Sequence, residues 1–261
     1  MITGIDHIVI LVDDLNAAIE QYQALGFDVE SGGRHPRFTE NALISVGDGS
    51  YLELIAFYEK DGAEQHRWHK YLASGGGLVD YAVGTGSVES QMKTAKDRGV
   101  PYAGPNDGAR KRPDGQEISW KTATPAGEGT AGLPFLIEDV TDRDLRVPGG
   151  SGVAHPNGVE SLDTLVIAVR DLEAASEKHR ALFGVEPEEL DFSESGHGIE
   201  GVLFKIGRFR IELHAPTMEG GITEELDARG EGPYEVIFRG AQTEMIDPQR
   251  AGNARLTIKE R

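Results

Sequence analysis

An internal repeat constrains the fold of this chain more than any other feature of its sequence. The segment DHIVILVDDLNAAIEQYQALGFDVE, residues 6–30, matches DTLVIAVRDLEAASEKHRALFGVEPEE, residues 163–189, at a constant offset of 157 residues. In both segments an apolar strand leads through an aspartate, Asp14 or Asp171, into an amphipathic helix. An aspartate at this place accepts a hydrogen bond from the first turn of a helix. Both segments continue into short strands around Gly turns, so the repeated unit is predicted to be β-α-β-β-β.

Two further copies extend the repeat over most of the chain. A weaker copy begins at residue 77, at an offset of 73 residues, and its last strands are predicted at 117–125 and 133–140. The stretch 103–117 within this copy is rich in Gly, Pro and charge, and is interpreted as a long insert, either a lid or a loop. A fourth, shortened copy begins at 232 and has no clear helix.

These copies predict an α+β fold in which tandem β-α-β-β-β units pair into two cleft-forming domains. The Pro/Gly-rich stretch at 146–160 is the expected linker, between a first domain at 1–145 and a second domain at 161–261. The second domain would contain one complete unit and one shortened unit.

Composition excludes several classes of function. The chain has no cysteine, which rules out disulfides, thiolate metal sites and cysteine nucleophiles. A formal net charge of -18 would repel nucleic acid and anionic lipid. No apolar run approaches the length of about 18 residues that a membrane-spanning helix needs, and no signal peptide is recognisable. We expect a cytoplasmic protein with a small-molecule partner, and whether it forms a homodimer is left open.

Two polar residues interrupt strands that are otherwise apolar. In GIDHIVILVDDL, strand alternation places His7 on one face with Ile5, Val9 and Leu11. In YLELIAF, Glu53 lies between two leucines. A lone histidine of this kind is commonly a buried group bonded to a neighbouring strand, but an unpaired buried carboxylate costs several kcal/mol. Glu53 is therefore predicted to have a partner, and the two residues together indicate a site.

The segments GIDHIVILVDDL, TENALISVGDGSYLELIAF and LPFLIEDV resemble the vicinal oxygen chelate superfamily, and within it the glyoxalase-like proteins. This resemblance implies a cleft of curved sheet around a divalent metal, with ligands from the first and last strands of each unit. The first-strand position corresponds to His7 and the last-strand position to Glu53. Alignment of the first strand of the second unit puts Asp80 at the position equivalent to His7. The fourth position falls at Phe135 in the register that aligns LPF with YLE.

The implied ligand set consists of His7, Glu53 and Asp80. One imidazole and two carboxylates suit Mn, Ni, Zn, Fe or Mg ions, and these ligand types do not select one of these metals over the others. By resemblance, such an ion would chelate two vicinal oxygens of a substrate and stabilise an enolate or oxyanion, with Glu53 or Asp80 as a catalytic base. Arg37, Asn41 and Trp120 are candidate substrate-binding residues, although each could equally cap a turn or pack in the core.

The second domain is expected to carry no equivalent site. Thr164 stands where His7 stands, with Glu212 and Glu235 at the other positions. Glu212 and His214 share one side of a strand and are a weaker alternative pair.

The function predicted is therefore a metal-dependent enzyme of lyase or isomerase type that acts on a small oxygenated substrate. The alternatives are a metal-free binding protein of the bleomycin-resistance type and a scaffold protein with no active site. An extradiol dioxygenase is disfavoured, because Asp80 stands where that class uses a second histidine.

Overall fold

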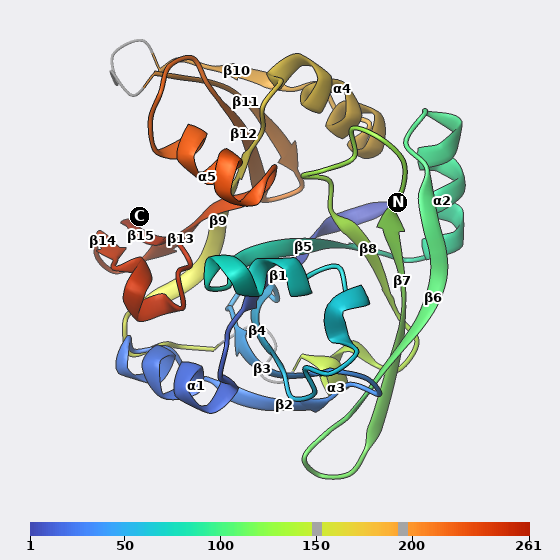
Figure 1. The fold of residues 1–261 in the computed structure, drawn as a ribbon, viewed down its shortest axis with the longest axis vertical. Helices are drawn as coiled ribbons and strands as arrows, with labels where there is room; N and C mark the ends of the chain where they lie inside the picture. Colours follow the sequence, from blue (N-terminus) through green and yellow to red (C-terminus); the bar gives the residue numbers. More distant parts are fainter. Residues whose placement is uncertain (148–152, 193–197) are drawn as a thin grey trace.

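The computed structural model describes residues 1–147, 153–192 and 198–261, whose strands form a closed barrel and an open sheet (Figure 1). Strands dominate and helices are few, which confirms the predicted α+β class. No helix in the described ranges has the length and apolar character needed to cross a membrane.

The barrel contains two β-α-β-β-β units. The first comprises β1 (Ile2–Leu11), α1 (Leu15–Ala24), β2 (Glu30–Arg34), β3 (Thr39–Ser45) and β4 (Tyr51–Phe57). The second comprises β5 (Gly77–Thr85), α2 (Val88–Asp97), β6 (Tyr102–Lys111), β7 (Glu117–Pro125) and β8 (Phe135–Asp139). The strand order is β1-β4-β3-β2-β6-β7-β8-β5, and antiparallel pairing of β1 with β5 joins the two units. Pairing of Arg34 on β2 with Lys111 on β6 closes the barrel.

The open sheet contains the remaining strands in the order β10-β11-β12-β9-β13-β15-β14. Its complete unit comprises β9 (Val159–Ala168), α4 (Leu172–Phe183), β10 (Glu188–Leu190), β11 (Ile199–Ile206) and β12 (Phe209–Pro216), and α5 (Gly221–Arg229) follows. The shortened unit comprises β13 (Gly232–Gly240), β14 (Glu244–Ile246) and β15 (Leu256–Glu260). In this shortened unit β13 leads to β14 with no α-helix between them, and a 3₁₀ helix at Pro248–Ala251 lies between β14 and β15.

Aspartates begin the two matching helices as their sequence pattern predicts. Asp14 accepts a hydrogen bond from the backbone nitrogen of Ala17 at 2.9 Å, and Asp171 accepts the equivalent bond from Ala174 at 2.9 Å. Each bond satisfies one of the backbone donors that an α-helix leaves free in its first turn.

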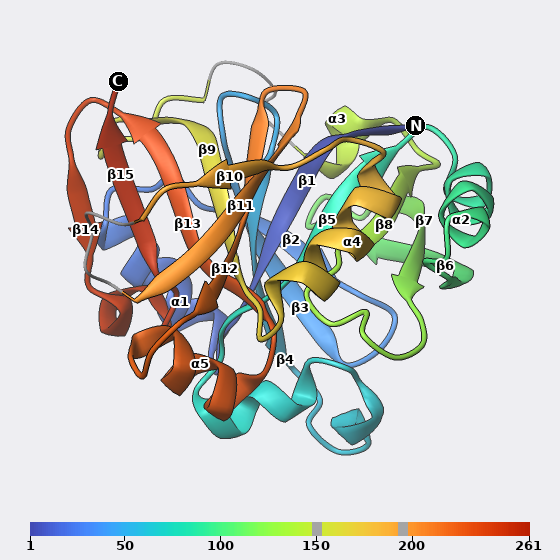
Figure 2. The same cartoon turned by 90° about the horizontal axis from the view of Figure 1, so that it is seen from above.

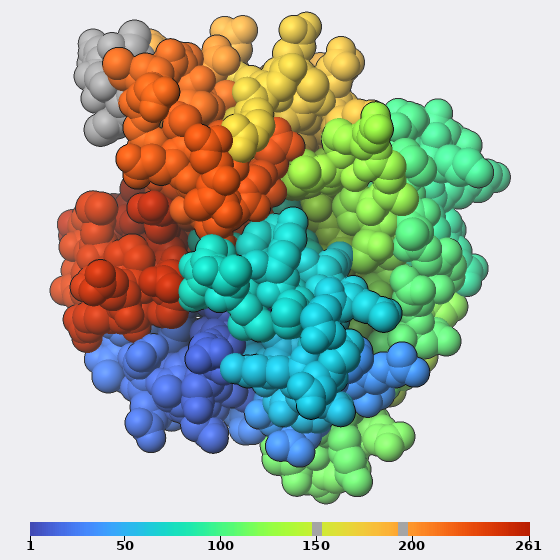
Figure 3. All heavy atoms as spheres, viewed as in Figure 1, coloured from blue at the N-terminus to red at the C-terminus, as the bar shows by residue number. Residues whose placement is uncertain are grey.

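The barrel and the open sheet share one hydrophobic core. The rings of Phe27, just after α1, and Phe238, on β13, lie 6.2 Å apart between centroids. The hydroxyl of Tyr22 donates to the backbone oxygen of Ala251 at 2.9 Å. Figure 1 and Figure 2 show α1 beside the short helix Pro248–Ala251 that precedes β15, and in Figure 3 the red and orange segments of the open sheet lie against the blue and cyan barrel. The division into domains at 146–160 stays a prediction, and residues 148–152 of that linker lie outside the described ranges.

The stretch 103–117 is a strand for most of its length, not a free lid or loop. Strand β6 pairs with β7 from Tyr102 opposite Pro125 to Lys111 opposite Glu117. Most β6 residues are exposed or half-buried, so this strand lacks the apolar pattern by which strands are recognised. This finding matters for the site, because β6 forms part of the wall of the barrel cavity.

Three short helices complete the described part of the barrel half. They are the 3₁₀ helices Ala63–Gln65 and His69–Ser74, which lead into β5, and α3 (Arg143–Arg146), which follows β8.

Candidate functional site

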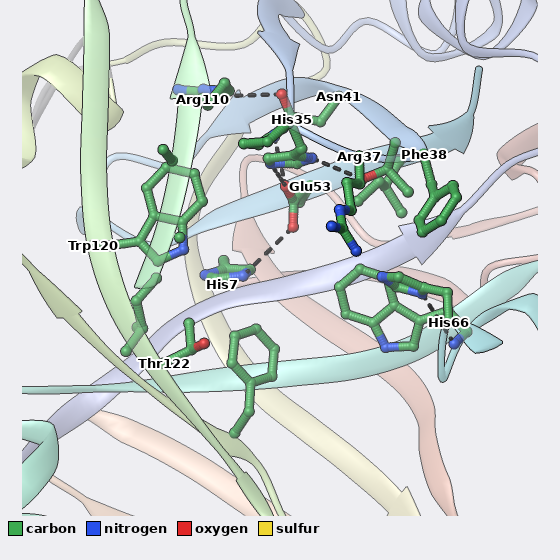
Figure 4. A pocket seen from close by; sticks show the side chains of 18 of the residues that line it. His7, His35, Arg37, Phe38, Asn41, Glu53, His66, Arg110, Trp120 and Thr122 are labelled. Atoms are coloured by element: carbon green, nitrogen blue, oxygen red, sulfur yellow. Dashed lines mark hydrogen bonds and ion pairs between the residues drawn. The ribbon is translucent and has the colours of Figure 1, made fainter. Parts of the chain in front are cut away.

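A cavity of ≈ 560 Å³ lies inside the barrel. Its lining includes five of the six residues predicted for the site: His7, Arg37, Asn41, Glu53 and Trp120 (Figure 4). The mouth of the cavity lies between the β2–β3 loop, strand β6 and the segment that precedes β5. The exposed residues Pro36, Arg37, Arg67 and Asp107 form its rim. Its volume is in the range of small-molecule sites.

His7 points into the cavity because β1 is irregular just before it. The pairing with β5 shifts register between Ile5 and His7. Val9 and Leu11 pack in the cluster inside the barrel, whereas Ile5 packs with Ile8 in the core shared with the open sheet. The prediction that Ile5 shares the face of His7 is therefore wrong, because one extra residue in a strand reverses the alternation of side chains.

The same irregularity lets Asp6 hold the His7 ring. His7 Nδ1 lies 2.7 Å from Asp6 Oδ1. Burial alone would raise the pKa of Asp6, but the charge of Arg146 and the hydrogen bond from His7 hold this pKa well below its usual value of 3.8. Asp6 is therefore an ionised acceptor, so Nδ1 carries the proton and donates it. Nε2 is then the ring nitrogen that faces the cavity.

A network of opposite charges fixes Asp6 in turn. Arg146, which is 3 % exposed, donates from Nη1 to Asp6 Oδ1 and from Nη2 to Asp6 Oδ2, both at 3.0 Å. It also donates to Asp139, at 2.5 Å and 3.0 Å, and to the Tyr51 hydroxyl at 2.7 Å. Arg143 adds an ion pair to Asp6. The backing of His7 is thus a rigid, charge-balanced cluster.

Glu53 is the buried carboxylate of the cavity. It is 6 % exposed, and it lies between two imidazoles on opposite sides, as Figure 4 shows. Its Oε2 is 3.6 Å from His7 Nε2, and its Oε1 is 4.0 Å from His35 Nε2. Asn41 Nδ2 donates to Oε1 at 2.5 Å. The predicted partner of Glu53 is therefore present, as His7 together with Asn41.

The distance between His7 and Glu53 has a chemical consequence. A neutral imidazole nitrogen and an ionised carboxylate oxygen both accept hydrogen bonds and would repel each other. A separation of 3.6 Å is longer than a normal hydrogen bond, so a reacting atom of a bound ligand can exchange a proton with either group.

His35 and Arg110 also line the cavity, and the sequence did not indicate them. His35 Nδ1 lies 2.8 Å from Thr39 Oγ1. Burial lowers the pKa of His35 more than the charge of Glu53 raises it, so this ring is neutral at pH 7. His35 occurs in a polar loop segment, HPRFTE, and Arg110 in the supposed insert, where neither residue interrupts an apolar strand.

Asp80 does not join His7 and Glu53. In the β1–β5 pairing His7 lies opposite Ala82, and Asp80 lies opposite Val9. One Asp80 oxygen receives the Trp68 Nε1 hydrogen at 2.8 Å and is paired with Arg67 at 2.8 Å. Asp80 is absent from the lining of the barrel cavity, so its predicted roles as metal ligand and base lack the required placement.

The positions implied for metal ligands do not form a metal site together. Glu53 lies opposite Val9, and Phe135 lies opposite Ala82, which confirms that Phe135 is the counterpart of Glu53. The second unit thus presents an aromatic ring, 5.3 Å from the His7 ring between centroids, where a fourth ligand would stand. In the described ranges no three His, Asp or Glu side chains are arranged to hold an ion. The residues at these positions therefore do not fit a divalent metal ion.

The open sheet places its candidates in a different arrangement. Thr164 donates to Asp163 at 3.0 Å, and Thr257 donates to Glu235 at 2.6 Å. Glu212 lies 3.0 Å from His214 Nε2 and 3.1 Å from an Arg210 nitrogen. Burial opposes ionisation of Glu212, but these two partners bring its pKa below 4.5, as in an ordinary ion-pair cluster.

Comparisons with known proteins agree with this architecture. A family model described as a glyoxalase-like domain matches residues 5–183, and no curated protein matches the sequence. A hypothetical protein from Staphylococcus aureus has a similar structure, with 14% identity, a TM-score of 0.73 and coverage of 98% of this chain and 99% of that chain. A mutant of 4-hydroxymandelate synthase from Streptomyces coelicolor is also similar, with 17% identity, a TM-score of 0.62 and coverage of 92% and 71%. At such identities the structures show likeness of fold alone.

Proposed function

The chain belongs to the glyoxalase-like domain family, and from this premise we propose that it is an enzyme of isomerase or lyase type that moves a proton on a small oxygenated substrate. At the level of the superfamily, membership supports a metal-dependent chelate-type enzyme or a small-molecule-binding protein. In our proposal the groups that move the proton are Glu53 and His7.

One observation carries this proposal: the buried pair of Glu53 Oε2 and His7 Nε2, 3.6 Å apart in the lining of the cavity. Glu53 takes a proton from the carbon next to a substrate carbonyl, and the electron pair of that bond moves onto the carbonyl oxygen. Return of the proton to a different atom or face completes an isomerisation. In a hydroxyketone, His7 Nε2, oriented by Asp6 and unprotonated, accepts the proton of the substrate hydroxyl and returns it to the enolate oxygen. The buried guanidinium of Arg110 supplies positive charge on the cavity wall.

The test measures exchange of carbon-bound hydrogen with solvent. The purified chain is incubated in D₂O with a panel of small ketones, hydroxyketones and 2-oxo acids, and proton NMR follows loss of the C–H signal next to the carbonyl. We expect at least one compound to exchange faster with the protein than without it. Glu53→Gln is expected to reduce that rate by about 10²-fold, because it removes the base while keeping the shape of the side chain.

Asp107→Asn is the matched control, because Asp107 also lines the cavity but is exposed at the rim. It is expected to leave the rate within about threefold. If no compound exchanges faster with the wild type than with Glu53→Gln, the proposal is wrong. Binding without exchange would instead indicate a sequestering protein.

Metal content is tested separately. The wild type, His7→Ala and Glu53→Ala are incubated with Mn²⁺, Ni²⁺, Fe²⁺ and Zn²⁺, desalted and analysed for bound metal. We expect equally little metal in all three proteins, and unchanged exchange by the wild type after EDTA treatment. One equivalent of metal in the wild type that both substitutions abolish would show that His7 and Glu53 do hold a metal ion.

A further inference from the structure

Among the residues that the structure describes, Arg110, on β6, is a buried cation with no anionic partner in direct contact. Its side chain is 3 % exposed. Nη1 donates to Asn41 Oδ1 at 3.0 Å, and Nη2 donates to the backbone oxygen of Arg146 at 2.9 Å, so both acceptors are neutral. Within the described ranges, Arg110 Nε is the one buried side-chain nitrogen or oxygen with no hydrogen-bond partner. A donor left in this state costs about 1–3 kcal/mol.

Arg146 shows what a satisfied arginine looks like in the same region. It is buried to the same extent, yet two carboxylates and the Tyr51 hydroxyl occupy its nitrogens. The carboxylate nearest to Arg110 in its hydrogen-bonded chain is Glu53, and Asn41 stands between them. Burial lowers the pKa of Arg110. Burial also opposes the charge of Arg146, but Tyr51 and the carboxylates of Asp6 and Asp139 raise the pKa of that residue. Arg110 carries a positive charge that the protein itself only partly balances.

The rest of the cavity indicates what kind of molecule would balance this charge. Arg110 lines the cavity, and so do apolar side chains of the cluster inside the barrel: Phe38, Ile55, Trp68, Trp120, Phe135 and Ile137. A guanidinium group matches a planar carboxylate with parallel hydrogen bonds. A ligand that suits both features has a carboxylate at one end and an apolar body at the other.

We propose that Arg110 is the anchor for a carboxylate group of the ligand, whose apolar body packs against the aromatic and aliphatic wall formed by Trp120, Phe135 and Ile55. This inference rests on the proposed function for the site, since it names the class of molecule that the cavity admits. It assigns binding to Arg110, and leaves proton transfer with Glu53 and His7.

Both tryptophans of the chain, Trp68 and Trp120, line this cavity, so tryptophan fluorescence reports directly on its occupancy. The wild type is titrated with phenylacetate, with the neutral isostere 2-phenylacetamide, and with benzylphosphonate. We expect phenylacetate to bind at least 10-fold more tightly than the amide, because only the carboxylate pairs with a charged donor. Equal affinity of acid and amide would overturn the proposal. Tighter binding of benzylphosphonate than of phenylacetate would overturn the assignment to carboxylates.

Variants then locate the anion site. Arg110→Gln is expected to reduce the preference for acid over amide to less than twofold, and Arg110→Lys to retain part of it, since the charge remains without the planar fork. Lys111→Gln is the matched control, because it removes the same charge from the next residue of β6, which is exposed. Circular dichroism checks that each variant is folded. An unchanged preference in folded Arg110→Gln, or its loss in Lys111→Gln, would overturn the proposal.

The two proposals can fail independently. Glu53→Gln is expected to bind phenylacetate within about threefold of the wild type while losing proton exchange. If the protein prefers the carboxylate but catalyses no proton exchange, the role of Arg110 as the carboxylate anchor is supported and the proposed proton transfer by Glu53 and His7 is wrong. If the protein catalyses proton exchange but shows no preference for the carboxylate, the proposed proton transfer is supported and the role of Arg110 is wrong.

Discussion

Replacing Arg146 by methionine is expected to lower the free energy of unfolding by about 3–5 kcal/mol. Methionine roughly preserves the volume of the side chain but removes the charge that faces Asp6 and Asp139. Asp6 is 4 % exposed, so water cannot solvate its carboxylate in place of the lost ion pair. Breaking a buried ion pair from one side leaves a buried charge uncompensated, and this is the costly case. Urea unfolding at pH 7 measures the change.

Arg143→Met is the matched control for this prediction. Arg143 pairs with the same two carboxylates, but its side chain is 38 % exposed. Water can replace much of its interaction, so the expected loss is below about 1 kcal/mol. Adding Asp6→Asn to Arg146→Met should recover part of the lost stability, because it removes the stranded charge. A similar loss for both arginine variants would show that burial of the pair is not the cause.

Lowering the pH from 6.5 to 4 is expected to remove about 3 kcal/mol of stability through His179 alone. This residue of α4 is fully buried, with Nδ1 2.8 Å from the backbone oxygen of Ala175 and Nε2 3.4 Å from the Tyr81 hydroxyl on β5. Burial lowers its pKa from 6.5 to about 4. In this range the unfolded chain binds a proton that the folded chain does not, so stability is complete above pH 6.5 and falls progressively towards pH 4.

Urea unfolding at several pH values, on the wild type and His179→Phe, isolates this contribution. The variant should lose less stability than the wild type between pH 6.5 and pH 4, whatever its stability at pH 7. Other groups contribute in the same direction, since burial also lowers the pKa of His66 to about 4, but that contribution is common to both proteins. Arg180→Gln, an exposed change on the same helix, should keep the wild-type dependence. Parallel curves for the wild type and His179→Phe would contradict the prediction.

The repeat made most of the fold predictable, because each copy carries its own local signals. Aspartates at 14 and 171 begin helices, the strand predicted at 117–125 has those bounds in the structure, and a strand begins at residue 232, where the fourth copy was predicted to begin. Such signals depend on neighbours in the sequence, so a single chain is enough to read them. Strand β6 escaped notice because its side chains are mostly exposed, which leaves no apolar alternation to detect.

The site was predictable only where a polar residue breaks an apolar strand. His7 and Glu53 stand out in this way, and the structure places them 3.6 Å apart. Arg110 and His35 lie in polar segments, where a further polar residue carries no signal. Asp80 holds the position in β5 that His7 holds in β1, but Trp68 and Arg67 bind its carboxylate outside the lining of the cavity.

The sequence by itself determined the repeated unit, the order of its strands and helices, and the two polar residues that the barrel would have to accommodate. These properties follow from local patterns of apolar, capping and turn residues. Only the tertiary structure decided which polar groups meet: a bulge turned His7 inward beside Asp6, closure of the barrel carried Arg110 to Asn41, and Phe135 took the place of a ligand. Such contacts join strands far apart in the chain, and a shift of one residue in any register would change them.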